Sequence, residues 1–203
     1  MNLAVFVSGR GSNLNAILSS FELKHKAVVK VVISDKKRCG AFEVAAAHSI
    51  PAYTVSDSNN HGYIAFQDIT KLLIELEIDL IVLAGFLKLI PMEIIKSFKD
   101  RIINIHPALL PFFGGKGMYG MNVHKAVFDS GMKISGATVH FVNEIFDNGK
   151  IISQGCVDIS NADSPEEIAQ KVLSVEHQLL PYVILKFAEN KIKIIDDRVV
   201  VED

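Results

Sequence analysis

The stretch Leu3-Ala-Val-Phe-Val-Ser-Gly-Arg-Gly-Ser-Asn-Leu14 decides the fold of the first half of the chain. Its apolar run at 3–7 leads straight into a glycine-rich turn, and a helix-like segment near 12–20 follows. An apolar run without polar alternation is expected of a parallel strand that is buried on both faces. The stretch therefore predicts a strand, a turn and a helix, which together form the basic unit of α/β folds.

The same unit recurs up to residue 106, and no repeat or linker interrupts it. We expect strands at 3–7, 28–33, 79–84 and 102–105, and helices near 12–20, 41–48, 61–77 and 91–98. This alternation predicts an α/β fold with an open, mostly parallel, doubly wound sheet. Such a half-chain is similar to a nucleotide-binding fold.

The pattern changes after Pro107. We expect a glycine-rich loop at 114–120, a helix near 122–130 and two strands at 134–143 and 150–158. The turn sequence Asp147-Asn-Gly149 separates the two strands, which predicts an antiparallel hairpin. Ser164 is a good N-cap, Pro165 is tolerated in a first turn and Glu167 completes a capping box. A final helix is therefore expected to run from Ser164 to about 189.

Length and composition bound the class of protein. A chain of 203 residues with 49% hydrophobic content has enough apolar material for one substantial core. We expect a single domain over 1–203, with a nucleotide-fold-like half at 1–106 and a second half at 107–203. The formal net charge of −2 gives no electrostatic reason to expect a nucleic-acid partner. Charged residues and Pro91 interrupt the apolar stretch 72–95, so we expect no membrane span.

The cysteines and the first residues bear on the compartment. Cys39 and Cys156 are the only cysteines and lie far apart, which predicts neither a disulfide framework nor a zinc cluster. The stretch that begins at Met1 lacks a basic region and a cleavage site, so we interpret it as a strand and not as a secretion signal. These features together favour the cytoplasm.

The glycine-rich turn is a candidate anion site. The free backbone N–H groups and the dipole of the following helix favour a phosphate on Gly11, Ser12 and Asn13. One alternative is a plain tight turn with Ser12 or Asn13 as the N-cap. Another is a dinucleotide fingerprint with Asp35 on a ribose. Leu14 argues against that fingerprint, because a small residue is needed there for close helix packing.

Asn104 and His106 lie two residues apart on an otherwise apolar strand, so both side chains point to one face. Burying an amide or an imidazole without hydrogen bonds costs roughly 1–3 kcal/mol, so the pair is either satisfied structurally or serves a ligand. Ligands of open parallel sheets bind beyond the carboxyl ends of the strands, where this pair is expected. By itself, Asp147 is explained by a turn, and His140 by a satisfied core histidine. Lys171 is explained by a solvated helix face.

Several motifs taken together resemble the phosphoribosylglycinamide formyltransferase family, over nearly the whole chain. They are Gly9-Arg-Gly-Ser-Asn-Leu14, Ala84-Gly-Phe-Leu-Lys-Leu89, Asn104-Ile-His-Pro-Ala-Leu-Leu-Pro111, Gly136-Ala-Thr-Val-His-Phe-Val142 and Asp147-Asn-Gly149. Methionyl-tRNA formyltransferases and formyltetrahydrofolate deformylases share the Asn-Ile-His-Pro segment. The Gly-Ser-Asn turn and the chain length favour the first family, because the others add a C-terminal barrel or an N-terminal regulatory domain.

The resemblance implies a formyl transfer from 10-formyltetrahydrofolate to the amine of phosphoribosylglycinamide, without a metal. The implied catalytic residues are Asn104, His106 and Asp147. The implied acceptor-binding residues are Gly11, Ser12 and Asn13 at the phosphate and Glu176 at the sugar, to which we add Lys171 as a candidate. The implied folate-binding residues are Leu87, Lys88, Leu89, Ile90, Asn143, Glu144 and Ile145, together with Asn104 and Asp147.

The expected chemistry follows from these groups. The amine attacks the formyl carbon, and Asn104 and a protonated His106 donate hydrogen bonds to the developing oxyanion. Asp147 favours the imidazolium by its opposite charge and takes the ammonium proton through a water.

The chain departs from the family at three places. Asn60 stands where some members place an arginine near the folate, and Lys150 replaces a common proline. The loop 112–121 is longer than usual, and its Lys116 is a further candidate for a phosphate or folate contact.

Two other functions remain open at this point. One is a formylfolate hydrolase that uses the same three residues with water in place of the amine. The other is a non-catalytic nucleotide-binding protein built on the glycine-rich turn.

Overall fold

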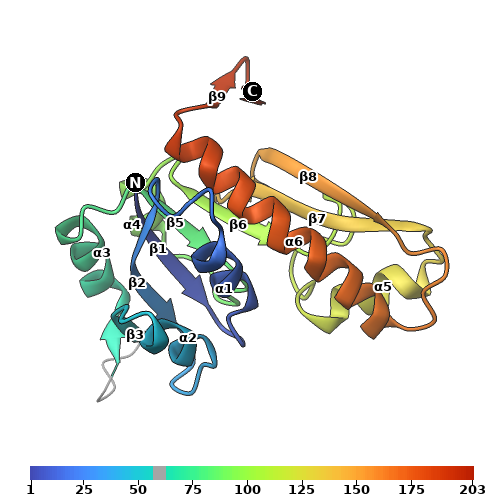
Figure 1. Ribbon diagram of the computed structural model, residues 1–203, viewed down its shortest axis with the longest axis horizontal. Coiled ribbons are helices and arrows are strands. Elements are labelled where there is room, and N and C mark those ends of the chain that lie inside the picture. The colour runs from blue at the N-terminus through green and yellow to red at the C-terminus, as the bar shows by residue number, and fades with distance from the viewer. Residues whose placement is uncertain (57–62) are drawn as a thin grey trace. The chain divides into compact units, whose positions relative to one another are not determined.

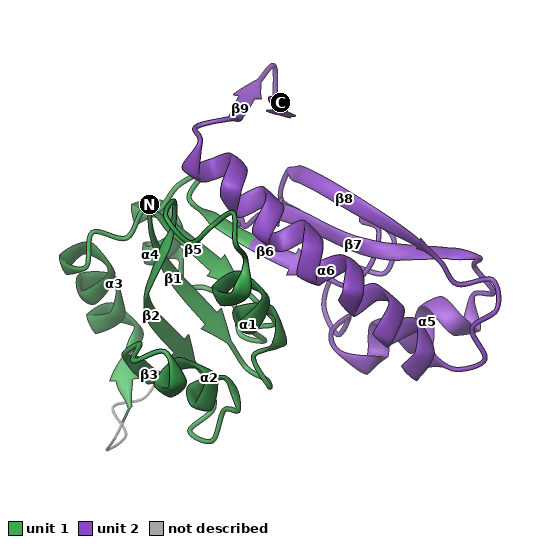
Figure 2. Ribbon diagram, in the orientation of Figure 1, with its two compact units in different colours: residues 1–103 green, residues 104–203 purple. Residues whose placement is uncertain are grey.

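The computed structural model describes residues 1–56 and 63–203. The described chain divides into two compact units, residues 1–103 and 104–203 (Figure 2). The single domain predicted over 1–203 stays a prediction. Among the described residues, no helix is both long enough and apolar enough to cross a membrane.

The first unit is a parallel sheet flanked by helices (Figure 1). Its strands follow the order β4-β3-β2-β1-β5, and each described pairing between them is parallel. The strands are β1 (Asn2–Val7), β2 (Val28–Ser34), β3 (Ala52–Ser56), β4 (Ile64–Ala65) and β5 (Leu80–Leu83). The helices are α1 (Ser12–Ser19), α2 (Ala41–Ala47), α3 (Phe66–Glu75) and α4 (Met92–Ser97). Residues 3–7 of β1 are fully buried, as their apolar run predicted.

Strand β6 (Ile102–His106) runs across the boundary between the units, and Asn104 to His106 belong to the second one. The rest of the second unit is a hairpin covered by helices. It contains α5 (Met121–Asp129), β7 (Ile134–Phe141), β8 (Ile151–Asp158), α6 (Pro165–Ala188), β9 (Ile192–Ile195) and β10 (Arg198–Val201). Strands β7 and β8 pair antiparallel, and α6 packs on both (Figure 1). The mostly parallel sheet and the antiparallel hairpin are thus confirmed.

The last long helix begins as its sequence predicted. The Ser164 hydroxyl accepts a hydrogen bond from the Glu167 N–H at 3.2 Å. The Glu167 carboxylate in turn accepts one from the Asp163 N–H at 2.9 Å. The first contact satisfies a backbone donor that an uncapped helix would leave open, and the second ties the residue before the N-cap to the first turn.

Three elements differ from the sequence-based expectation. The predicted helix 61–77 is wrong in its extent, because Ile64 and Ala65 pair with β3 as strand β4 and α3 begins only at Phe66. The hairpin is not closed by a tight turn at Asp147. Strand β7 ends at Phe141, so a connection of residues 142–150 joins it to β8. The strands β3, β9 and β10 were not predicted.

Candidate active site

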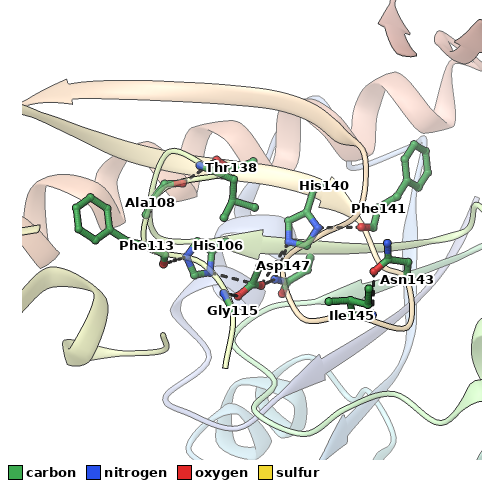
Figure 3. Close-up of polar contacts among 12 residues, drawn as sticks. His106, Ala108, Phe113, Gly115, Thr138, His140, Phe141, Asn143, Ile145 and Asp147 are labelled. Carbon is green, nitrogen blue, oxygen red and sulfur yellow. Dashed lines mark hydrogen bonds and ion pairs between the residues drawn. The ribbon is translucent and has the colours of Figure 1, made fainter. Parts of the chain in front are cut away.

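Four polar side chains of the second unit converge at the end of β6, and three of them, His106, His140 and Asp147, are labelled in Figure 3. Asn104 and His106 come from β6, His140 from β7, and Asp147 from the connection after β7. The Asp147 carboxylate lies 3.6 Å from His106 Nδ1, 3.7 Å from His140 Nε2 and 3.4 Å from Asn104 Nδ2. The structure therefore brings Asn104, His106 and Asp147 together, with His140 as a fourth member.

The protonation of the His106 ring follows from its neighbours. Its Nε2 lies 2.8 Å from the carbonyl oxygen of Phe113, which can only accept a hydrogen bond, so Nε2 carries the proton. In the neutral ring Nδ1 is then a free base that faces Asp147 at 3.6 Å. A proton that arrives at His106 must therefore be taken up at Nδ1, next to a carboxylate.

His140 fixes the orientation of the Asn104 amide. His140 Nδ1 donates to the Phe141 carbonyl at 2.8 Å, so in the neutral ring Nε2 accepts. Asn104 Nδ2 donates to this Nε2 at 3.1 Å and to Asp147 Oδ1 at 3.4 Å. Since the Asp147 carboxylate can only accept, the NH₂ end of the amide must point toward it. The contact with Asp147 is the longer of the two.

The loop after Pro111 closes over Asp147 and His106 through its backbone. The Phe113 carbonyl holds His106, and the Gly115 N–H donates to Asp147 Oδ2 at 3.0 Å. Phe113 and Asp147 both have left-handed φ values, of 54° and 53°, a conformation that is uncommon for a bulky residue such as Phe113 and easier for an aspartate. The loop thus contributes to the site through its peptide groups.

Thr138 braces the segment that follows His106. Its hydroxyl donates to the Ala108 carbonyl at 2.7 Å and accepts from the Leu110 N–H at 3.0 Å (Figure 3). Gln154 Nε2 donates to the same hydroxyl and to the Leu110 carbonyl, each at 3.0 Å. Strands β7 and β8 therefore fix the chain between His106 and the loop that carries Phe113.

Burial and the neighbouring groups shift the pKa values of His106 and Asp147 in opposite directions. Burial lowers the pKa of His106 below 6.5, and this effect outweighs the Asp147 charge and the Phe113 hydrogen bond, which raise it. Burial by itself would raise the pKa of Asp147. Its contacts with His140, His106 and the Gly115 N–H nevertheless bring that pKa below 3.8. At neutral pH the free protein therefore pairs an ionised Asp147 with a His106 whose pKa lies below 6.5. The expectation that His106 is protonated when the oxyanion forms stays a prediction.

The other predicted residues of the second unit lie on α6 and on the connection after β7. Glu176 is buried on α6, and Lys171 Nζ donates to the Asp158 carbonyl at 3.3 Å. The Asn143 side chain accepts from the Ile145 N–H at 3.0 Å, and Glu144 and Ile145 are exposed. Lys116 and Lys150 lie at the surface, where Lys150 pairs with Asp197 at 2.6 Å.

The remaining predicted residues belong to the first unit. Gly11 is the N-cap of α1, with φ 83° and no side-chain cap hydrogen bond, so the alternative of Ser12 or Asn13 as N-cap is wrong. A Cβ at Gly11 would lie 2.8 Å from the Ala41 backbone, so glycine is required there. In the segment 87–90, Leu87 and Leu89 are exposed and Ile90 is buried. Asn60 lies outside the described residues.

Sequence reasoning missed three contributors to the site, namely His140, Phe113 and Gly115. His140 looked like a core residue because its neighbours on the strand are apolar, although it shares a strand face with Thr138. The roles of Phe113 and Gly115 rest on backbone atoms, which no side-chain pattern announces. Only the excess of glycine in the loop 114–120 gave a signal.

Comparison with known proteins gives a consistent result. The formyl transferase family model matches residues 1–184. A chloroplastic phosphoribosylglycinamide formyltransferase of Arabidopsis thaliana is 42% identical over 97% of this chain and 68% of its own length. The phosphoribosylglycinamide formyltransferase of Bacillus subtilis is 37% identical over 89% of this chain and 91% of its own. The crystal structure of glycinamide ribonucleotide transformylase 1 from Symbiobacterium toebii superposes with a TM-score of 0.89 at 32% identity, over 100% of this chain and 94% of that one.

Proposed function

We propose that this chain, which belongs to the phosphoribosylglycinamide formyltransferase family, transfers the formyl group of 10-formyltetrahydrofolate to the glycinamide amine of 5-phosphoribosylglycinamide. The products are formylglycinamide ribonucleotide and tetrahydrofolate, and the reaction is a step of de novo purine biosynthesis. The observation that carries the proposal is the convergence of Asn104 and the buried His106 on Asp147, at 3.4 Å and 3.6 Å.

The first step is the attack of the neutral amine on the formyl carbon. This forms a tetrahedral intermediate with an ammonium nitrogen and an oxyanion. The Asn104 amide donates to the oxyanion by exchanging its 3.4 Å contact with Asp147 for the substrate oxygen. A donor held in place before the reaction stabilises the developing charge without reorganisation.

The second step moves the proton. The ammonium group loses a proton, through a water, to the pair formed by Asp147 and His106. Nδ1 of His106 is the acceptor, because Nε2 already donates to Phe113. The resulting imidazolium lies 3.6 Å from the Asp147 carboxylate, which stabilises it. The imidazolium then gives its proton to N10 of the folate. The oxyanion re-forms the carbonyl of the product amide as the carbon–nitrogen bond to N10 breaks, which releases tetrahydrofolate and leaves His106 neutral again.

The binding roles are assigned by matching positions to the family. Gly11, Ser12 and Asn13 bind the acceptor phosphate. The left-handed Gly11 at the N-terminus of α1 supports this role, because the first N–H groups of a helix attract an anion. Glu176 and Lys171 bind the rest of the acceptor, and the segments 87–90 and 143–145 line the folate pocket.

Two small-molecule substrates account for the activity. We assign the protein to the cytoplasm and expect neither a nucleic-acid partner nor a membrane partner. We assign no metal to the reaction, because the proposed steps use only an amide, an imidazole and a carboxylate.

The test is formyl transfer from 10-formyl-5,8-dideazafolate, followed by absorbance, with and without phosphoribosylglycinamide. Turnover that depends on the acceptor is the expected result. Formate release that does not depend on it would identify a hydrolase. An inactive protein that binds a dinucleotide would favour the nucleotide-binding alternative. His106→Ala with an unchanged circular dichroism spectrum is the control for a contaminating activity.

A further inference from the structure

The Ser8 side-chain hydroxyl joins three segments of the first unit, and the proposed chemistry does not use it. Ser8 follows β1, Asp35 follows β2 and Leu87 lies in the segment after β5. Strand β1 pairs in parallel with both β2 and β5, so the carboxyl ends of all three strands lie at one edge of the sheet. This is the edge at which open α/β sheets bind their ligands.

Ser8 joins the other two segments by hydrogen bonds. Its hydroxyl donates to Asp35 Oδ1 at 2.5 Å and accepts from the Leu87 N–H at 2.9 Å. The Ser8 backbone N–H also donates to the Gly85 carbonyl at 3.0 Å. Ser8 therefore contacts the segment after β5 at two peptide groups, one on either side of Phe86.

Asp35 determines the direction of the Ser8 hydroxyl. A hydroxyl has one proton, and the carboxylate takes it, so a lone pair of Oγ is left to face the Leu87 N–H. The Asp35 side chain is only 4% exposed, and its other oxygen lies 3.5 Å from Lys36 Nζ. Burying an unpaired carboxylate costs free energy, so Asp35 needs both of its partners. The Ser8 hydroxyl is therefore held in the orientation that donates to Asp35.

Phe86 anchors the same segment from the other direction. Its ring packs edge-on against Phe6 of β1, with the ring centroids 5.3 Å apart. This contact fixes where the segment lies, whereas the Ser8 hydrogen bonds fix how its peptide groups are turned. Peptide orientation decides recognition wherever a ligand binds to backbone N–H and C=O groups.

We infer that Ser8, oriented by Asp35, is a positioning residue that sets the backbone of 87–90 and thereby the affinity for the formylfolate. The inference rests on the proposed function, which assigns 87–90 to the folate pocket. It also gives Asp35 a role other than the ribose contact considered for a dinucleotide fingerprint.

The first experiment separates folate binding from acceptor binding. Ser8→Ala should raise the KM for the formylfolate roughly three- to tenfold, the factor associated with one lost hydrogen bond. The kcat and the KM for the acceptor should not change, because only uniform binding of the folate is lost. Asp35→Ala should act like Ser8→Ala, whereas Asp35→Asn keeps an acceptor oxygen for the hydroxyl and should restore the normal KM.

A matched control exists in the same unit. The Ser20 hydroxyl donates to Glu22 Oε2 at 3.1 Å at the surface, so Ser20→Ala removes a similar pair and should leave both KM values unchanged. If Ser8→Ala instead raised the KM for the acceptor, or lowered kcat alone, the inference would be overturned.

A second measurement does not depend on turnover. In the wild type, hydrogen exchange at the Leu87 amide should be slowed by the Ser8 hydroxyl, and Ser8→Ala should abolish this protection. Calorimetry with 10-formyl-5,8-dideazafolate should show the same three- to tenfold loss of affinity. If the wild type did not transfer formyl groups, the proposed function would be refuted, but the inference about Ser8 would not. If Ser8→Ala left the protection of the Leu87 amide or the affinity for 10-formyl-5,8-dideazafolate unchanged, the inference about Ser8 would be refuted.

Discussion

His106 and Asp147 show how one pair of side chains prepares a proton transfer. His106 is kept neutral by burial, so it can accept a proton, while Asp147 is kept ionised, so it can stabilise the imidazolium that results. The Phe113 carbonyl makes Nδ1 the acceptor by occupying Nε2. Phe113 thus sets which nitrogen of His106 is protonated, and Asp147 stabilises the charge that His106 then gains.

The first prediction concerns the titration of His106. The negative charge of Asp147 raises the pKa of His106 against the larger effect of burial. Asp147→Asn removes that charge, so the pKa of His106 should fall further below its value in the wild type. The measurement is the NMR titration of the His106 ring in the two proteins, with Asp129→Asn on α5 as the control. A pKa of His106 that rises in Asp147→Asn would contradict this account of the pair.

The second prediction concerns Asn104. Removal of one preorganised oxyanion donor costs about 10²- to 10³-fold in kcat, so Asn104→Ala should lower kcat by that factor. Asn122→Ala is the matched control, because Asn122 also donates through Nδ2, to the Gly117 carbonyl at 3.1 Å, at the surface. The measurement is kcat from steady-state kinetics, with both substrates at saturating concentrations. A drop in kcat of less than tenfold would remove Asn104 from the oxyanion role.

Sequence reasoning reached part of this site, and the reason differs from residue to residue. Asn104 and His106 were found because polar side chains interrupt an apolar strand. Asp147 was assigned through a family resemblance, since its local sequence predicts only a turn. Neither the partnership of His140 nor the peptide contacts of Phe113 and Gly115 was predicted, because they depend on which segments the fold brings together.

At the scale of elements, the connection 142–150 carries Asp147 back to β6. The Phe141 N–H donates to the Lys150 carbonyl at 2.9 Å, which closes the base of this connection. Gly149 packs against Phe141 so tightly that a Cβ would lie 1.6 Å from its carbonyl oxygen. The glycine is therefore required by the close approach of two backbones.

The third prediction tests that requirement. Gly149→Ala must push the connection away from Phe141, and overpacking of this kind costs typically about 1–3 kcal/mol. We expect the free energy of unfolding to fall by at least this amount, with a loss of activity because Asp147 is two residues away. Gly9→Ala is the control in urea unfolding, since a Cβ at Gly9 would meet no atom within 4 Å and the φ of Gly9 is not left-handed. Equal unfolding midpoints for the two variants would refute the argument.

The elements themselves were predicted unevenly. Strands β1, β2, β5 and β6 were found because buried parallel strands are continuous apolar runs. Strand β3 was missed because Ala52-Tyr-Thr-Val-Ser56 mixes polar and apolar residues, and β4 is only two residues long. The C-terminal pair β9 and β10 lies largely exposed, so no buried face marks it in the sequence.

At the scale of the whole molecule, the buried histidines make stability depend on pH. Burial lowers the pKa of His106, His124 and His177 below 6.5. Below pH 6.5 the unfolded chain therefore binds more protons than the folded one, so acid favours unfolding. The Asp147 pKa is also lowered, and its contribution is lost later, as the pH falls below 3.8 and through the folded-state pKa.

The last prediction follows from these signs. The midpoint temperature of unfolding should fall as the pH is lowered from 7.5 to 5, mostly below pH 6.5, because there the unfolded chain protonates its histidines while the folded one resists. His124→Gln should reduce this slope, because His124 is buried and its Nδ1 has no hydrogen-bond partner among the described residues, so its protonation inside the fold is unfavourable. His48→Gln, at an exposed position, is the control. Calorimetric scans of the three proteins at matched ionic strength measure the slopes directly. A wild-type midpoint that rose on acidification would mean that the folded protein binds these protons more tightly than the unfolded chain, which is the opposite of what burial imposes.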